Sequence, residues 1–174
     1  MRAEGAVGAP RARAPVTKPA EPRRAVRPLD DSALNHLVGY AASRAALEMR
    51  KVFSRHMEGL DLRVPEFSIL MLVASNDEVN QKQLGQALDI SPPNLAVTLD
   101  RMAERGWIER VRSTLDRRAQ HIYLTVEGRT LSERSRRISA TMEGPALAGL
   151  SLAERALLIE LLQKIRPRAA SASI

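Results

Sequence analysis

The sequence contains no cysteine, and aromatic residues make up only 3% of its 174 positions. Without cysteine the chain has no disulfide framework, no thiolate zinc ligands and no thiol for redox sensing. It also has no uninterrupted apolar run near the ~20 residues that a membrane-spanning helix needs, so we expect no membrane partner. The basic residues before position 29 lack the apolar segment of a secretory signal, and a cytoplasmic protein is the default expectation.

Hydrophobic residues make up 44% of the chain, which is enough for one domain with a real core. The net charge of +7 is concentrated in Met1 to Pro28, where seven basic residues face two acidic ones. This segment also holds five of the ten prolines and almost no large apolar side chain. We therefore predict that residues 1–28 form a disordered basic arm. The arm is either a solubilising tail or a segment attracted non-specifically to polyphosphate.

Two helices are predicted after the arm. Apolar residues recur at intervals of three and four, which predicts an amphipathic helix of about 25 residues starting at Asp31 or Ser32. Gly59 to Asp61 should break it. Pro65 suits the first turn of a second, nearly all-apolar helix that ends at Ser75, and we expect this helix to be central and buried.

Two shorter helices, 81–88 and 92–105, follow with a brief turn between them. Asn80 with Gln83 resembles a capping box at the first helix, and Ser91 is a good N-cap for the second. Two helices separated by so short a turn indicate a helix-turn-helix arrangement.

The second of these helices is the candidate DNA reader. Leu95, Leu99 and Met102 share one face and should point into the core. The residues predicted to meet DNA, at the helix start or on the outward and flanking positions, are Ser91, Pro93, Asn94, Val97, Thr98 and Arg101. Asparagine can bond adenine, arginine can bond guanine, and valine or a threonine methyl can touch the thymine methyl. The alternative interpretation is an ordinary solvated helix face.

After Gly106 the apolar period changes to that of β-strands. Residues 107–111 and 120–124 read as two strands of a hairpin, and a hairpin directly after a helix-turn-helix makes a winged helix. The predicted DNA-binding residues of this wing are Arg112, Asp116, Arg117 and Arg118. Arginines on a narrow loop suit the electronegative minor groove of an A·T-rich duplex, and Asp116 can hold the Arg118 guanidinium in one pose.

Two more helices complete the predicted fold. Thr125 caps a long helix that Gly144-Pro145 should kink or end, and Ser151 with Glu154 forms a capping box before a last helix through about Ile165. The first and last helices are richer in Leu, Ala and Met than one small domain needs, which favours an interlocked homodimer. Plain intramolecular packing is the alternative. We predict a mostly α winged helix-turn-helix with terminal dimerisation helices over residues 29–166, followed by a frayed tail, 167–174.

The run from Leu99 to Arg110 and the run from Asp116 to Gly128 resemble the recognition helix and wing of the MarR family of transcription regulators. The order of elements matches from about Ser32 to Ile165. The resemblance implies a homodimer that reads a pseudo-palindrome, with half-sites about one helical turn, ~10 bp, apart. Two departures are Pro92-Pro93, which removes two N–H donors, and the interruption at Gly144-Pro145.

The resemblance also implies release from DNA by a small molecule, such as an aromatic acid of the hydroxycinnamate type or its coenzyme A thioester. Candidates for lining the ligand cleft are Tyr40, Arg44, Met49, Phe53, His56, Phe67 and Met71. An arginine on an apolar face can pair with a carboxylate. The competing interpretation assigns these residues to core packing and surface ion pairs.

The leading hypothesis is a dimeric, sequence-specific DNA-binding repressor that a small aromatic carboxylate or thioester relieves. The alternative is a constitutive or architectural DNA-binding protein without an effector. An enzyme is disfavoured because nothing titratable converges in the sequence. His36, His56 and His121 are scattered without metal-ligand spacing, so we expect no metal and no cofactor.

Overall fold

The computed structural model describes residues 29–112 and 120–165, and the chain divides into two units, Met1–His36 and Leu37–Ile174. In the first unit, Ser32–Leu34 form a single 3-10 turn, η1. The Ser32 N–H donates a hydrogen bond of 3.0 Å to Asp30 Oδ1, and this bond lowers the pKa of the Asp30 carboxyl. The predicted arm, 1–28, and tail, 167–174, lie outside the described residues.

The first long helix, α1 (Val38–Met57), begins later than the sequence pattern predicts. The predicted start at Asp31 or Ser32 is wrong because Ser32–Leu34 form η1, with Asp31 as its N-cap, and Leu37 is extended, with ψ of 115°. The predicted break at residues 59–61 is confirmed. A short 3-10 turn, η2 (Glu58–Leu60), follows the helix, and Asp61 adopts a left-handed conformation with φ of 45°.

Helix α2 (Val64–Ala74) is the buried central helix that the sequence predicts. Pro65 lies in its first turn, where a missing N–H costs no helical hydrogen bond. Ile69 and Leu70 have no solvent exposure. The carboxylate of Glu66 accepts a hydrogen bond of 2.7 Å from the Arg63 N–H and so caps the helix start.

The helix-turn-helix consists of α3 (Gln81–Leu88) and α4 (Pro92–Glu104). Asn80 and Gln83 form the predicted capping box, each side chain accepting a bond from the other residue's N–H, at 3.0 and 2.8 Å. Ser91 occupies the N-cap position of α4, but its side chain makes no capping hydrogen bond.

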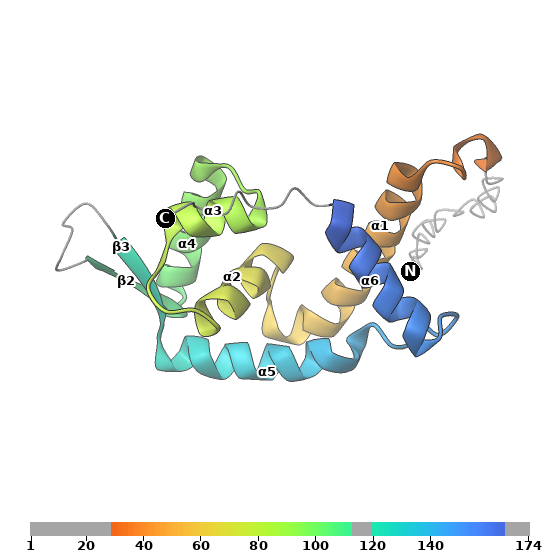
Figure 1. Cartoon of the computed structure of the whole chain (residues 1–174). Coiled ribbons are helices and arrows are strands. Elements are labelled where there is room, and N and C mark those ends of the chain that lie inside the picture. The colour runs from red at the N-terminus through yellow and green to blue at the C-terminus, as the bar shows by residue number, and fades with distance from the viewer. Residues whose placement is uncertain (1–28, 113–119, 166–174) are drawn as a thin grey trace, which may run out of the picture. The chain divides into compact units, whose positions relative to one another are not determined.

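A small antiparallel sheet follows α4 (Figure 1). Strands β2 (Ile108–Arg112) and β3 (Gln120–Leu124) form the predicted hairpin, with Ile108 opposite Leu124. A third strand that the sequence did not reveal, β1 (Val79–Asn80), pairs with β3 and places Val79 opposite Ile122. The strand order is β1-β3-β2, with β1 at an edge of the sheet. Because β1 ends at Asn80 and α3 begins at Gln81, the helix starts directly from this edge.

Helix α5 (Val126–Met142) contacts α1, α2 and β3. Its N-cap is Thr125, whose Oγ accepts a 3.0 Å hydrogen bond from the Gly128 N–H, as predicted. The helix ends before Gly144-Pro145, and a series of turns leads to α6 (Leu152–Ile165). The predicted capping box of α6 is present, because the Ser151 N–H and hydroxyl both donate to Glu154 Oε2.

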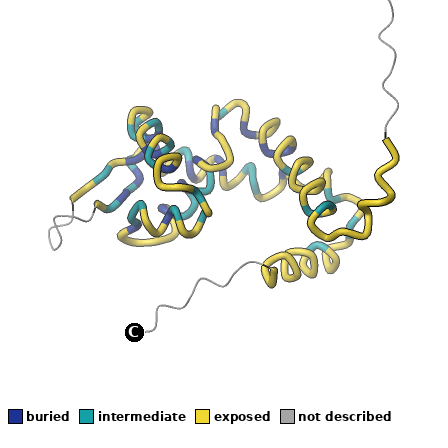
Figure 2. The backbone as a smooth tube through the Cα atoms, turned by 90° about the horizontal axis from the view of Figure 1, so that it is seen from above, coloured by how far each residue is buried: buried dark blue, intermediate teal, exposed yellow. Residues whose placement is uncertain are grey.

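The hydrophobic core lies between the second half of α1, α2, α3, α4, the sheet and α5. It includes Leu95, Leu99 and Met102, each with no solvent exposure, which confirms the predicted inward face of α4. Helix α6 has no buried residue and is exposed along almost its whole length (Figure 2). In residues 29–112 and 120–165, no helix combines the length and the apolarity needed to cross a bilayer.

Candidate nucleic-acid interface

The outward face of α4 lies opposite its buried Leu95-Leu99-Met102 stripe. Ser91, Pro93 and Asn94 are exposed, and Val97 is 65% exposed. Thr98 is half-buried, and its hydroxyl donates a 2.9 Å hydrogen bond to the Asn94 carbonyl. The Thr98 methyl group is therefore the part of this side chain left for an apolar contact.

Arg101, the sixth candidate reader, forms an ion pair. Its Nε donates a hydrogen bond of 2.8 Å to Oε1 of Glu66, and its Nη2 lies 2.7 Å from the same oxygen. Glu66 has no solvent exposure. The Arg101 side chain is 33% exposed, and the Nε–Nη2 edge of its guanidinium faces Glu66. Its predicted role in reading guanine stays a prediction.

Two further ion pairs hold α4 against its neighbours. Arg105 donates to Asp61 Oδ2 at 2.7 Å and to the Asp61 carbonyl at 3.0 Å, and its guanidinium lies 4.0 Å from the centre of the Trp107 ring. On the other side, Arg110 Nη2 of β2 lies 2.6 Å from Asp100 Oδ1. The side chains of Asp61 and Asp100 are 83% and 57% exposed. Each of these ion pairs therefore contributes at most about 1 kcal/mol to folding stability.

The pair of Glu66 with Arg101 differs from these two in its burial. Removing one partner of a buried ion pair lowers folding stability by about 3–5 kcal/mol, because the charge of the other partner is left buried and uncompensated. The partial exposure of Arg101 puts its own removal toward the lower end of that range. The position of α4 relative to α2 therefore depends on Glu66 more than on either surface pair.

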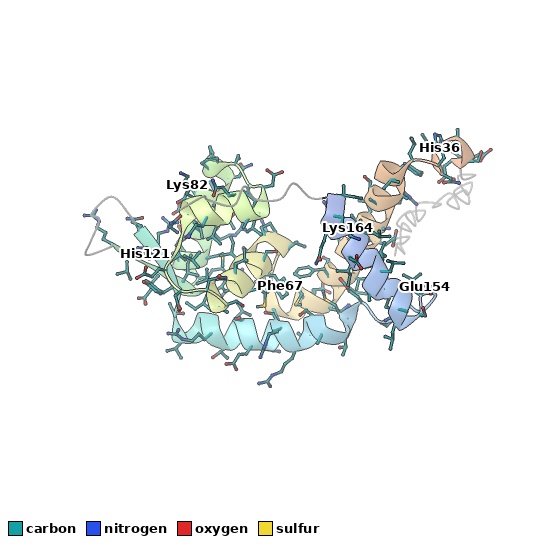
Figure 3. The ribbon with its side chains drawn as sticks, in the orientation of Figure 1. His36, Phe67, Lys82, His121, Glu154 and Lys164 are labelled. Atoms are coloured by element: carbon teal, nitrogen blue, oxygen red, sulfur yellow. The ribbon has the colours of Figure 1, made fainter. Side chains whose placement is uncertain are left out.

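The wing is described only at its base. Arg112 is exposed at the end of β2, while Asp116, Arg117 and Arg118 lie outside the described residues. Figure 3 labels Lys82 on α3 and His121 on β3. His121 Nδ1 is 3.0 Å from the Glu78 carbonyl, so this histidine has a structural hydrogen bond.

The structure brings two of the seven ligand-cleft candidates into direct contact. The rings of Phe53 on α1 and Phe67 on α2 meet edge to face, with centroids 5.4 Å apart. Phe53 is buried, whereas Phe67, labelled on α2 in Figure 3, is half-buried. This aromatic pair joins α1 to α2, the helix that carries Glu66.

The other candidates on α1 are spread along the helix. Met49 and Tyr40 are half-buried, Arg44 is exposed, and His56 is exposed with its Nδ1 2.8 Å from the Val52 carbonyl. Because Nδ1 must carry the proton for this bond, Nε2 is the His56 nitrogen left for another partner. Met49 lies one turn before Phe53 on α1, and Met49 and Phe67 pack against the core cluster that contains Phe53.

Met71, the last candidate, lines a cavity of about 430 Å³ between the end of α2, β3 and α5. Its polar lining includes Tyr123, Ser132, Arg129 and Arg136. In the described part of the chain, no three His, Asp or Glu side chains gather in a way that would hold a metal ion.

Sequence reasoning did not identify Glu66, Asp61 or Asp100 as partners of the arginines around α4. Glu66 lies in the first turn of α2, a position where glutamate is common as a capping residue, and nothing local predicts its burial. Its partner Arg101 is 35 positions away, so the ion pair depends on the packing of α2 against α4. Residue spacing within one helix carries no signal for such a pair.

Comparisons with known proteins agree with this geometry. A model of the MarR family matches residues 59–119, which include most of η2 and all of α2, the helix-turn-helix and the first wing strand. No curated protein matches the chain by sequence.

Three solved structures are similar over most of the chain. The transcriptional repressor CouR bound to a 23-mer DNA duplex is 32% identical with a TM-score of 0.75, covering 80% of this chain and 99% of its own. CouR bound to p-coumaroyl-CoA is 30% identical with a TM-score of 0.72, covering 79% and 97%. A cysteine-to-serine mutant of MarR from E. coli, complexed with operator DNA, is 21% identical with a TM-score of 0.71, covering 79% and 100%, and supports the fold alone.

The order of elements, the exposed face of α4 beside a β-hairpin, the family match and the identity to CouR all agree. The chain belongs to the MarR family of winged-helix transcriptional regulators.

Proposed function

We propose that this protein is a homodimeric repressor that binds a pseudo-palindromic operator and leaves it when a small aromatic acid or its coenzyme A thioester binds. The observation that carries the proposal is the solvent-facing side of α4, where Val97 is exposed opposite the fully buried stripe and Asn94 is exposed beside it. A helix fixed in this way against a core can enter the major groove as a rigid body.

The reading surface proposed for each subunit combines this helix with the wing. Asn94 and Val97 suit adenine and the thymine methyl, and Arg101 suits guanine. Arg112 at the base of the wing leads toward Arg117 and Arg118, which we propose to enter the minor groove with Asp116 orienting Arg118. Ser91 and Pro93 lie at the helix start, close to the phosphates. The methyl of Thr98 completes the apolar contact.

The dimer is proposed from the apolar surface that one subunit leaves exposed. On α6, Leu157, Leu158, Leu161 and Leu162 are 53%, 42%, 47% and 43% exposed. On α1, Leu47 and Val38 are 47% and 67% exposed. Apolar surface on this scale over two helices is typical of a protein–protein interface. A second copy of the chain that covers it would bring two α4 helices together for a two-fold operator.

The effector is proposed from the comparison with CouR, which was solved with p-coumaroyl-CoA. In this chain the Phe53–Phe67 pair supplies an aromatic wall, and Arg44 supplies a guanidinium for an anionic group. We propose that the second subunit completes the cleft. Ligand binding would then favour a dimer whose α4 helices are wrongly spaced for the operator.

Fluorescence anisotropy on duplexes from the region upstream of its own coding sequence tests the proposal. The titration is repeated with a panel of aromatic acids and their coenzyme A thioesters, p-coumaroyl-CoA included. Sequence-dependent binding that one compound abolishes is the expected result. Tight binding that no compound disturbs would favour a constitutive DNA-binding protein instead. Affinity equal to that for random duplex would contradict the use of α4 as a reader.

A further inference from the structure

Glu66 is more deeply buried than a helix-capping residue needs to be. Its Oε2 accepts the Arg63 N–H at 2.7 Å, which is the whole of its capping role. Its Oε1 accepts a 2.8 Å hydrogen bond from Nε of Arg101 and lies 2.7 Å from Nη2, and the residue has no solvent exposure. A carboxylate removed from water in this way needs a charged partner to compensate it, and here the partner comes from the proposed recognition helix.

The guanidinium of Arg101 has two edges that can each make a two-atom contact. Glu66 occupies the Nε–Nη2 edge, and the Nη1–Nη2 edge is left over. Arg101 follows Asn94 by seven positions and Val97 by four, so the three residues share one face of α4. Arg101 therefore projects from the same face as the proposed readers, and a third of its side chain is exposed.

We propose that Glu66 is a positioning residue for DNA recognition, which fixes the Arg101 guanidinium so that its free edge makes a two-atom contact with guanine. The inference rests on the proposed use of α4 as the recognition helix. A guanidinium held in one pose loses less side-chain entropy on binding, and the guanine O6 and N7 contact requires a defined orientation. The negative charge of Glu66 also reduces the attraction of Arg101 to any phosphate.

The variant Glu66→Gln tests whether Glu66 positions Arg101, because it removes the charge of the side chain at position 66 while keeping its size. The glutamine has the same size and its amide oxygen still accepts the Arg63 N–H, but it lacks the charge that holds Arg101. A mobile Arg101 is expected to lower discrimination at the base pair it reads by roughly tenfold. Binding to random duplex is expected to stay equal or to rise, because the freed positive charge can pair with phosphate.

The experiment uses the full-length chain and a duplex that it selects from a randomised pool. Anisotropy is measured on this duplex, on a set in which each base pair of one half-site is changed in turn, and on random duplex. We expect Glu66→Gln and Arg101→Ala to lose discrimination at the same base pair, and the double variant to lose no more than Arg101→Ala. Glu133→Gln removes an equally charged group from α5, paired with Arg137 of the same helix, and should preserve discrimination.

Two results would overturn the inference. One is that Glu66→Gln raises the affinity for every duplex alike and keeps discrimination at every base pair, since Glu66 would then only neutralise charge. The other is that Arg101→Ala changes discrimination nowhere. If circular dichroism shows that Glu66→Gln is unfolded, the same titrations are made with Arg101→Lys. Lysine keeps a positive charge opposite Glu66 but lacks the second guanidinium edge that would contact guanine. Full discrimination by that variant would also overturn the inference.

The outcome for Asn94→Ala distinguishes this inference from the proposed function. If Asn94→Ala loses discrimination while Glu66→Gln does not, the recognition helix stands and the positioning role fails. If neither variant changes discrimination, the proposed use of α4 fails as well.

Discussion

Gly128 lies so close to Trp107 that a Cβ on the glycine would be 1.8 Å from the tryptophan carbonyl oxygen. The same oxygen accepts a 3.2 Å hydrogen bond from the Thr125 N–H, and Thr125 Oγ donates to the Gly106 carbonyl at 2.6 Å. These contacts fix the start of α5 to the segment that joins α4 to β2. The reading helix, the wing and the long helix α5 therefore meet at one packed junction.

Gly128→Ala should destabilise the fold because backbone atoms, which cannot rotate away, occupy the place of the new methyl group. Overpacking of this kind costs about 1–3 kcal/mol, measured as the free energy of unfolding in urea. Gly39→Ala in α1 is the matched control, since a Cβ there meets nothing within 4 Å. Alanine in that helix should be neutral or stabilising by up to about 1 kcal/mol. Equal stability of the two variants would contradict the junction.

Asn94→Ala should weaken discrimination between operator and altered duplexes by about 1–3 kcal/mol, because the asparagine amide can bond adenine at two atoms. Asn94 is exposed and its side chain has no role in the core, so unfolding stability should not change. Anisotropy titrations give the affinities. Asn76→Ala, an exposed asparagine in the loop after α2, is the control and should leave affinity unchanged. Loss of affinity that is equal on all duplexes would indicate a phosphate contact instead.

The elements predicted correctly from sequence are those fixed by neighbouring residues. The capping pairs Asn80 with Gln83 and Ser151 with Glu154 act over three positions, and the buried stripe of α4 repeats within one helix. Local rules of this kind need no knowledge of the rest of the fold.

The features that sequence reasoning missed depend on distant residues. Strand β1 has two residues and exists only because Val79 pairs with Ile122, more than forty positions away. The Glu66–Arg101 pair likewise requires α2 and α4 to be packed together. The start of α1 was misplaced because the apolar period continues through η1, where Asp30 closes a local turn that helical periodicity does not detect.

Arg118→Ala should cost about 1–3 kcal/mol of DNA binding and leave folding and dimerisation intact. The expectation comes from the sequence, since the wing tip lies outside the described residues, and from the hairpin base that the structure shows at Arg112. Arg137→Ala, which removes an 82% exposed arginine from α5, is the control for loss of one positive charge. Equal losses by the two variants would contradict a specific role for the wing.

Leu161→Glu should dissociate the proposed dimer, because it places a charge within the exposed apolar face of α6. Light scattering coupled to size exclusion should change from twice the chain mass of 19.2 kDa to a single chain. Operator affinity should fall with it, since one subunit reads only one half-site. Lys164→Ala alters a residue of the same helix that pairs with Glu160 at its polar side, and this variant should remain dimeric. A dimeric Leu161→Glu would place the interface elsewhere.

The start of α6 should respond to acid through Glu154. Hydrogen bonds to its carboxylate, first from the Ser151 hydroxyl and then from the Ser151 N–H, lower the pKa of Glu154 below its ordinary value of 4.5. The folded protein then binds this proton less readily than the unfolded chain. The stabilisation by Glu154 is therefore complete above pH 4.5 and is lost as the pH falls through the lower pKa of the folded state.

Glu154→Gln isolates this effect, because glutamine keeps the length of the side chain but is neutral at every pH. The midpoints of thermal unfolding, followed by circular dichroism, should differ between wild type and variant at neutral pH and converge as the pH falls below 4.5. Glu160→Gln, farther along α6 and paired with Lys164, controls for general loss of a carboxylate. A difference that stays constant through acid pH would show that the charge of Glu154 contributes nothing to the cap.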